Sequence, residues 1–280
     1  MRAQKKSVLG MVLVSLVMAI LRTVIISVNM EKNVADNDTY YLPDSLEFYV
    51  YAVFTVILTV LIIFSSIMLC KKSRLQLSPE QGMVPAASLI LAFALIGSAL
   101  FYTIAFAFKS IEFTVFEFLV FLFCVFSAIN FIFSGLRFNA NKENPARLST
   151  LALVPLALSV FRLVSDFIAS SAAPLASSGV YHLVGLIAVL LFFLFEGKSY
   201  VLPVSAAAYT CFGYISIYFL LIYSFPNLVM HCFGVFAFDY AATFSVIDLG
   251  LVVYISTRLA GMRRVKTKAE IAEQYSEIEE

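Results

Sequence analysis

Eight long apolar runs constrain the fold of this chain more than any other feature of the sequence. They recur from residue 8 to residue 257, separated by short connectors that carry most of the charges. A transmembrane helix needs about 20 predominantly apolar residues. The predicted spans are Val8–Val28, Leu46–Cys70, Val84–Phe108, Phe113–Leu136, Leu148–Ser170, Gly179–Phe195, Leu202–Phe225 and Ala241–Thr257. The sequence therefore predicts an all-α integral membrane protein, a bundle of eight transmembrane helices whose surface contacts the lipid bilayer.

The composition agrees with this assignment and excludes other classes. Hydrophobic residues make up 61% of the 280 residues and charged residues only 13%, whereas soluble domains are about half apolar and a quarter charged. The basic residues are scattered between the apolar runs and form no patch for nucleic acid. The first run follows Arg2, Lys5 and Lys6 as in a signal peptide, but it is too long and has no small-residue cleavage site. We interpret it as the first transmembrane helix.

The basic residues are distributed unevenly between the two sides of the predicted bundle. Fifteen of the 19 lie on the side of the N-terminus: Arg2, Lys5, Lys6, Lys71, Lys72, Arg74, Arg137, Lys142, Arg147, Lys198, Arg258, Arg263, Arg264, Lys266 and Lys268. The opposite side has only Lys32 and Lys109. Because basic loops stay in the cytoplasm, we predict a multi-pass protein of the cell (plasma) membrane with both termini cytoplasmic. Its transmembrane domain covers residues 1–262, and residues 263–280 form a charged cytoplasmic tail.

Two of the spans resemble each other. Met11–Met30 and Leu151–Ser170 align without gaps, and the alignment places Arg22 opposite Arg162. One interpretation is an internal duplication, with halves 1–145 and 146–262 forming two parallel four-helix repeats related by an axis along the membrane normal. The other is that Leu- and Val-rich spans look alike by chance. The sequence leaves both open.

Ionisable residues inside or beside the spans are the candidate ligand-binding residues. They are Arg22, Glu117, Arg162, Asp166, His182 and Asp248. Their positions along the helices place them in the outer half of the membrane, which suggests a polar cavity open to the outside. A guanidinium stays charged and offers a planar fork to a carboxylate or phosphate. The two arginines would thus bind a small anionic or zwitterionic solute, and the aspartates would neutralise the empty site or carry a coupling proton or cation.

A structural role is the alternative for the same residues. Arg162 would pair with Asp166, one helical turn away, and Arg22 would pair with Glu117 or Asp248 across the bundle. Such pairs orient helices without binding a solute. The protein would then be a structural or sensory membrane module that acts through a protein partner, which the sequence does not identify.

Enzymatic motifs are absent from the sequence. The only two histidines, His182 and His231, lie far apart and do not form His-Glu-x-x-His, and there is no Gly-x-Ser-x-Gly or phosphate-binding glycine loop. The four cysteines fall in or beside different spans without metal-ligand spacing. We therefore predict no catalytic residues, no metal and no cofactor, and a non-enzymatic function in solute transport or binding.

Two prolines bear on the helix geometry. Pro155 lies within the fifth span and is predicted to kink it, which would free a backbone carbonyl. Pro226 follows the predicted end of the seventh span at Phe225. Residues Pro226–Tyr240 are mostly apolar but too short to span, so they are predicted to form an outer loop lying at the interface or re-entering the membrane.

Overall fold

The computed structural model describes residues 2–32, 39–41, 46–70, 73–75, 83–107, 115–136, 145–172, 177–235, 240–262 and 264–265. Its helices are α1 (Arg2–Val28), α2 (Leu46–Leu69), α3 (Val84–Ala107), α4 (Val115–Leu136), α5 (Pro145–Leu151), α6 (Leu153–Ala172), α7 (Ser177–Val201), α8 (Ala206–Cys232) and α9 (Tyr240–Gly261). Apart from Arg264 and Val265, the predicted cytoplasmic tail lies outside the described residues.

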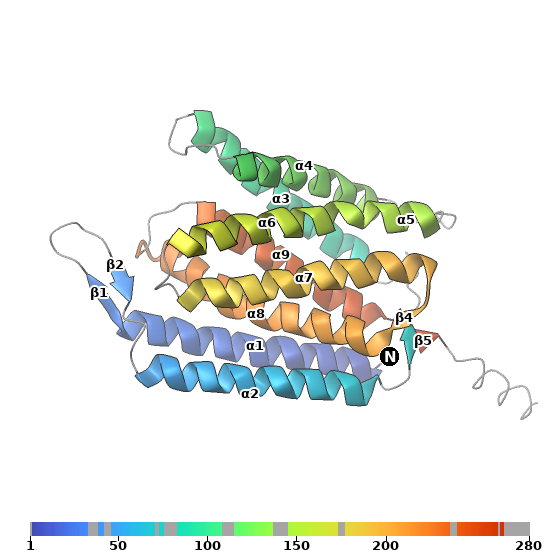
Figure 1. Cartoon of the computed structure of the whole chain (residues 1–280), viewed down its shortest axis with the longest axis horizontal. Coiled ribbons are helices and arrows are strands. Elements are labelled where there is room, and N and C mark those ends of the chain that lie inside the picture. Colours follow the sequence, from blue (N-terminus) through green and yellow to red (C-terminus); the bar gives the residue numbers. More distant parts are fainter. Residues whose placement is uncertain are drawn as a thin grey trace, which may run out of the picture.

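Within these described ranges, eight helical segments are long and apolar enough to cross a membrane, which agrees with the predicted number. The short α5 and the longer α6 together supply the fifth segment, Ala146–Ile168. The helices run side by side along the long axis of the molecule (Figure 1). We call the end at which α1 begins and α9 ends the terminal end, and the opposite end the hairpin end.

Short strands mark the two ends. At the hairpin end, β1 (Met30–Lys32) pairs antiparallel with β2 (Thr39–Tyr41). At the terminal end, β3 (Arg74–Leu75) lies between β4 (Val204–Ser205) and β5 (Arg264–Val265), which brings three connectors together.

Helices α8 and α9 form the centre of the bundle. In their apolar segments 67% and 61% of the residues are buried, against 22% for α1 and α2, which lie at the edge. Helix α8 packs against α1, α2 and α7, and α9 packs against α3 and α8. Gly250 permits the close approach of α9 to α3, since a Cβ there would lie 3.2 Å from Leu91 Cδ1. The exposed apolar side chains of α1 and α2 suit contact with lipid acyl chains.

Two helices are longer than the sequence predicted because each contains a charge that was taken as its boundary. Helix α7 continues past Phe195 to Val201 and so includes Glu196, and α9 continues past Thr257 to Gly261 and so includes Arg258. Arg258 was assigned to a cytoplasmic connector, but its side chain is only 2% exposed. The two residues form an ion pair with each other, which is why both helices can extend.

The seventh span was predicted to end before Pro226, and this is wrong. Helix α8 passes through Pro226 and ends at Cys232, so the first part of the predicted outer loop is helical. Proline has no N–H, so the carbonyl of Ile222 lacks its usual donor four residues later. Arg22 of α1 replaces that donor, with its Nη1 2.7 Å from the Ile222 oxygen. The helix ends beyond Cys232, where Gly234 has a φ of +69° and the amide of Val235 donates to the carbonyl of Met230.

Pro155 produces the same situation in the fifth span. The helix is interrupted at Ala152, between α5 and α6, one turn before the proline. The carbonyl of Leu151, which Pro155 cannot serve, accepts a hydrogen bond of 3.1 Å from Nδ2 of Asn130 in α4. The break and the freed carbonyl agree with the prediction from the sequence.

The packing of the helices does not add support to the duplication. Helices α3 and α4 pack closely, as do α8 and α9, their counterparts in the second half. In contrast, α7 packs closely against α8, whereas their counterparts α2 and α3 make no comparable contact within the described residues. The two repeats remain a prediction from the sequence.

Candidate functional site

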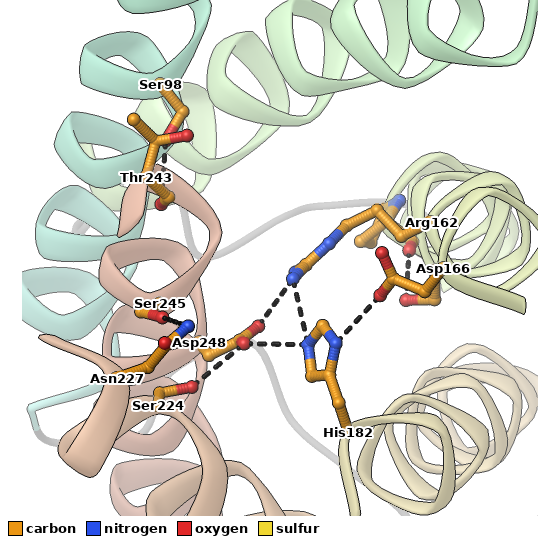
Figure 2. Close-up of polar contacts among 11 residues, drawn as sticks. Ser98, Arg162, Asp166, His182, Ser224, Asn227, Thr243, Ser245 and Asp248 are labelled. Atoms are coloured by element: carbon orange, nitrogen blue, oxygen red, sulfur yellow. Dashed lines mark hydrogen bonds and ion pairs between the residues drawn. The ribbon is translucent and has the colours of Figure 1, made fainter. Parts of the chain in front are cut away.

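A network of ionisable side chains lies inside the bundle in its hairpin half. Four of the six candidate residues, Arg162, Asp166, His182 and Asp248, meet there, joined by Ser224 (Figure 2). They come from α6, α7, α8 and α9, so the network connects four helices. We call these five residues the Arg162 network.

The aspartate of α9 is the centre of this network. Arg162 Nη2 lies 2.8 Å from Asp248 Oδ1. The other oxygen, Oδ2, lies 2.9 Å from His182 Nε2 and accepts a hydrogen bond of 2.9 Å from the hydroxyl of Ser224. Arg162 and Asp248 are 1% and 0% exposed. A carboxylate buried this deeply is costly without partners; Oδ2 has two, whereas Oδ1 has the ion pair with Arg162 and no hydrogen bond among the described residues.

His182 connects the two aspartates. Its Nδ1 lies 2.8 Å from Asp166 Oδ2 and its Nε2 lies 2.9 Å from Asp248 Oδ2, with the ring stacked on Tyr223 at a centroid distance of 4.1 Å. A neutral imidazole donates from one ring nitrogen, whereas an imidazolium donates from both. Both contacts can therefore be hydrogen bonds only when the ring carries its second proton, so the proton content of His182 is coupled to the geometry of the network.

Arg162 has donors that the network does not use. Its Nε has no hydrogen-bond partner among the described residues, and its Nη2 lies 3.3 Å from His182 Nε2 in addition to the aspartate. The guanidinium also lies over the ring of Phe244, with Cζ 4.7 Å from the ring centroid. A guanidinium has five N–H donors, so Arg162 can donate hydrogen bonds to a further anionic or polar partner.

The pairs proposed in the structural alternative differ from the pairs observed. Arg162 forms its ion pair with Asp248 of α9, and Asp166 contacts His182 of α7. Arg22 is not part of the network: besides the Ile222 carbonyl, it lies over the ring of Tyr181, with Cζ 4.6 Å from the centroid. Glu117 is half-buried in the first turn of α4 and is likewise no member of the network.

A second buried cluster, in the terminal half, was not predicted from the sequence. Oε1 of Glu196 accepts from Arg258 Nε at 2.5 Å, from the hydroxyl of Tyr254 at 2.8 Å and from that of Tyr200 at 3.3 Å. Arg258 also donates to the Tyr200 hydroxyl. The available signal was that Glu196 and Arg258 each end an apolar run. We call these four residues the Glu196 cluster.

Helices α7 and α9 each contribute one ionisable residue to the Arg162 network and one to the Glu196 cluster. Helix α7 supplies His182 and Glu196, and α9 supplies Asp248 and Arg258. At 1.5 Å per residue, the two members on α9 are roughly 15 Å apart along the helix and those on α7 roughly 21 Å apart.

Comparison with protein-family models, curated proteins and solved structures finds no match for this chain. The function must therefore be inferred from these two sites.

Proposed function

We propose that the protein binds and transports a small anionic or zwitterionic solute, without catalysis, and that Arg162 holds the carboxylate or phosphate of that solute. The observation that carries this proposal is the division of the Asp248 carboxylate between two sets of partners. Oδ1 faces Arg162, while Oδ2 is held by His182 and Ser224. Asp248 occupies the place on the guanidinium that a solute carboxylate would take.

This division allows Arg162 to exchange partners at low cost. When a solute anion replaces Asp248 on the guanidinium, Asp248 keeps its two contacts through Oδ2 and is not left as an unpaired buried charge. Breaking a buried pair by removing one partner otherwise costs about 3–5 kcal/mol. A bidentate partner would also use the Nε donor that is free among the described residues.

The charge of the network also fits an exchange of this kind. With neutral His182, one arginine and two aspartates carry a net charge of −1; with protonated His182 the network is neutral. An incoming anion adds one negative charge at a depth where net charge is costly. A network with protonated His182 takes up this charge more readily than one with neutral His182, so binding of the proposed anion is expected to favour the protonated ring.

A structural or sensory module is the second candidate, and one observation favours it. Arg162, Asp248 and His182 are buried and paired with one another, which is the arrangement expected if the charges only lock four helices together. The module would then act through a protein partner.

Thermal unfolding of the detergent-purified protein against a panel of small anions, zwitterions and cations tests the proposal. A solute at about one hundred times its Kd should stabilise the protein by about 2.7 kcal/mol. The informative variant is the double substitution Arg162→Met with Asp248→Asn, which removes both charges and leaves neither unpaired. The matched control is Arg22→Met, which removes a buried arginine outside the network.

The proposal requires that one solute class stabilises the wild type and the Arg22→Met variant and fails to stabilise the double variant. Stabilisation that survives in the double variant would place the solute elsewhere. If no solute stabilises the wild type, the structural candidate takes precedence.

A further inference from the structure

A small cavity lies beside the Glu196 cluster, in the terminal half of the bundle. It is a partly open cavity with a volume of about 40 Å³, lined by residues of α4, α5, α6, α7 and α9. Its polar lining residues include Asn130, Ser134, Glu196 and Tyr254. About 10–15 Å³ of such volume accommodates one water molecule, so the cavity has room for a few.

Two buried acceptor atoms on residues that line this cavity have no donor among the described residues. One is Oε2 of Glu196 and the other is Oδ1 of Asn130. Their side chains belong to residues that are 2% and 8% exposed. All three donors to Glu196 go to Oε1, and Asn130 uses its Nδ2 for the Leu151 carbonyl. A buried acceptor left without a donor costs about 1–3 kcal/mol.

We infer that this cavity is a hydrated proton-binding site, in which water delivers a proton to Oε2 of Glu196. Water donates to both Oε2 and Asn130 Oδ1, which satisfies the two acceptors. When a hydronium ion transfers its proton to Oε2, one O–H bond of hydronium breaks, the O–H bond of the carboxylic acid forms, and a water molecule remains. The new O–H group then donates to the cavity water.

The groups around Glu196 define what this proton changes. Arg258 and Tyr254 approach from α9, Tyr200 lies one turn later on α7, and Tyr209 approaches from α8. Among these four residues, Arg258 has the positive charge that faces the carboxylate. The hydroxyls of Tyr200 and Tyr254 donate hydrogen bonds to the carboxylate, and Tyr209 lies near it. Protonation removes the charge that faces Arg258 and so weakens the contact between α7 and α9 at this end. The third nitrogen of the Arg258 guanidinium, Nη1, has no partner among the described residues.

This inference is independent of the proposed solute site, because it depends only on residues of the terminal half. It assigns a ligand, the proton, to a site that solute binding at Arg162 does not require. A result that contradicts the proton site therefore does not contradict the solute site, and the reverse also holds.

Infrared spectroscopy of the full-length protein in lipid during a pH titration tests the inference. The C=O stretch of a protonated carboxylic acid is separate from the carboxylate bands. Glu196→Gln removes the acid but leaves Arg258 as a buried charge without its carboxylate, so it is combined with Arg258→Met, and neither charge of the pair is then left alone. Glu47→Gln, which removes an exposed carboxylate in the first turn of α2, is the matched control.

The wild type and Glu47→Gln should share a component of the acid band, growing as the pH falls, that the double variant Glu196→Gln with Arg258→Met lacks. In D2O the band should shift in the folded protein, because the cavity water exchanges. Identical acid bands in the wild type and this double variant across the folded pH range would overturn the inference. A wild type without this band whose stability rises with sodium at constant pH would also overturn it, because the ligand would then be a metal cation.

Discussion

The contact between Arg22 and the Ile222 carbonyl gives the sharpest test of how this bundle is held together. In this structure the arginine supplies the hydrogen-bond donor that Pro226 lacks. If that is its main role, Arg22 should become dispensable once residue 226 has an N–H of its own. Arg22→Met should therefore cost less stability in a Pro226→Ala background than in the wild type.

The coupling between the two substitutions can be estimated from the contact. A hydrogen bond from a charged donor contributes about 1.5–3 kcal/mol in soluble proteins, and the 2.7 Å separation is typical of a charge-assisted bond. Double-mutant cycles in a membrane protein give at most about 1.7 kcal/mol for hydrogen bonds between helices. The two ranges overlap near 1.5 kcal/mol, which is the coupling we expect. The loss of the Tyr181 contact and the removal of a buried charge occur in both backgrounds and cancel.

Free energies of unfolding for the four proteins of this cycle can be measured by SDS titration in mixed micelles. Arg22→Met combined with Pro155→Ala is the control, since Pro155 frees a different carbonyl, and these two effects should add. A coupling below about 0.5 kcal/mol for Arg22 with Pro226, the usual error of additivity, would refute the assigned role. The pair Asn130→Leu and Pro155→Ala repeats the test with a neutral donor.

Two further predictions concern the charges and the orientation of the bundle. Asp248→Asn should destabilise the protein by about 3–5 kcal/mol in thermal unfolding, because Arg162 is left buried without its carboxylate; Asp166→Asn should cost less, since that side chain is 17% exposed and forms its ion pair with the histidine. A membrane-impermeant maleimide should label exposed Cys232, at the hairpin end of α8, in intact cells and should not label buried Cys124. Labelling of Cys232 only after the membrane is opened would reverse the predicted orientation.

The number of helices could be predicted from the sequence because it depends on a single physical requirement. An apolar run must match the thickness of the hydrocarbon core, and each run can be evaluated without reference to the others. All eight predicted runs correspond to helices in the structure. The same local criterion also located four of the residues that meet in the Arg162 network, because an ionisable side chain inside an apolar run is conspicuous.

The errors arose where a residue depends on a partner far away in the sequence. Glu196 and Arg258 were interpreted as the ends of two helices, although each is inside a helix because the other neutralises it. Pro226 was interpreted as the end of another, although Arg22, about 200 residues earlier, makes the helix tolerable there. The partner of Arg162 was sought one turn away, where Asp166 lies, but it comes from α9. Local sequence could not reveal these pairs.

The placement of the two clusters restricts how α7 and α9 can move relative to each other. A shift of one helix along the other would have to break the contact of His182 with Asp248 and that of Glu196 with Arg258 at once. A tilt breaks only one of them and leaves the other as the pivot. Because Asp248 retains Ser224 of α8 as a partner and Glu196 retains the hydroxyl of Tyr200 on its own helix, either contact can open without leaving its carboxylate unpartnered.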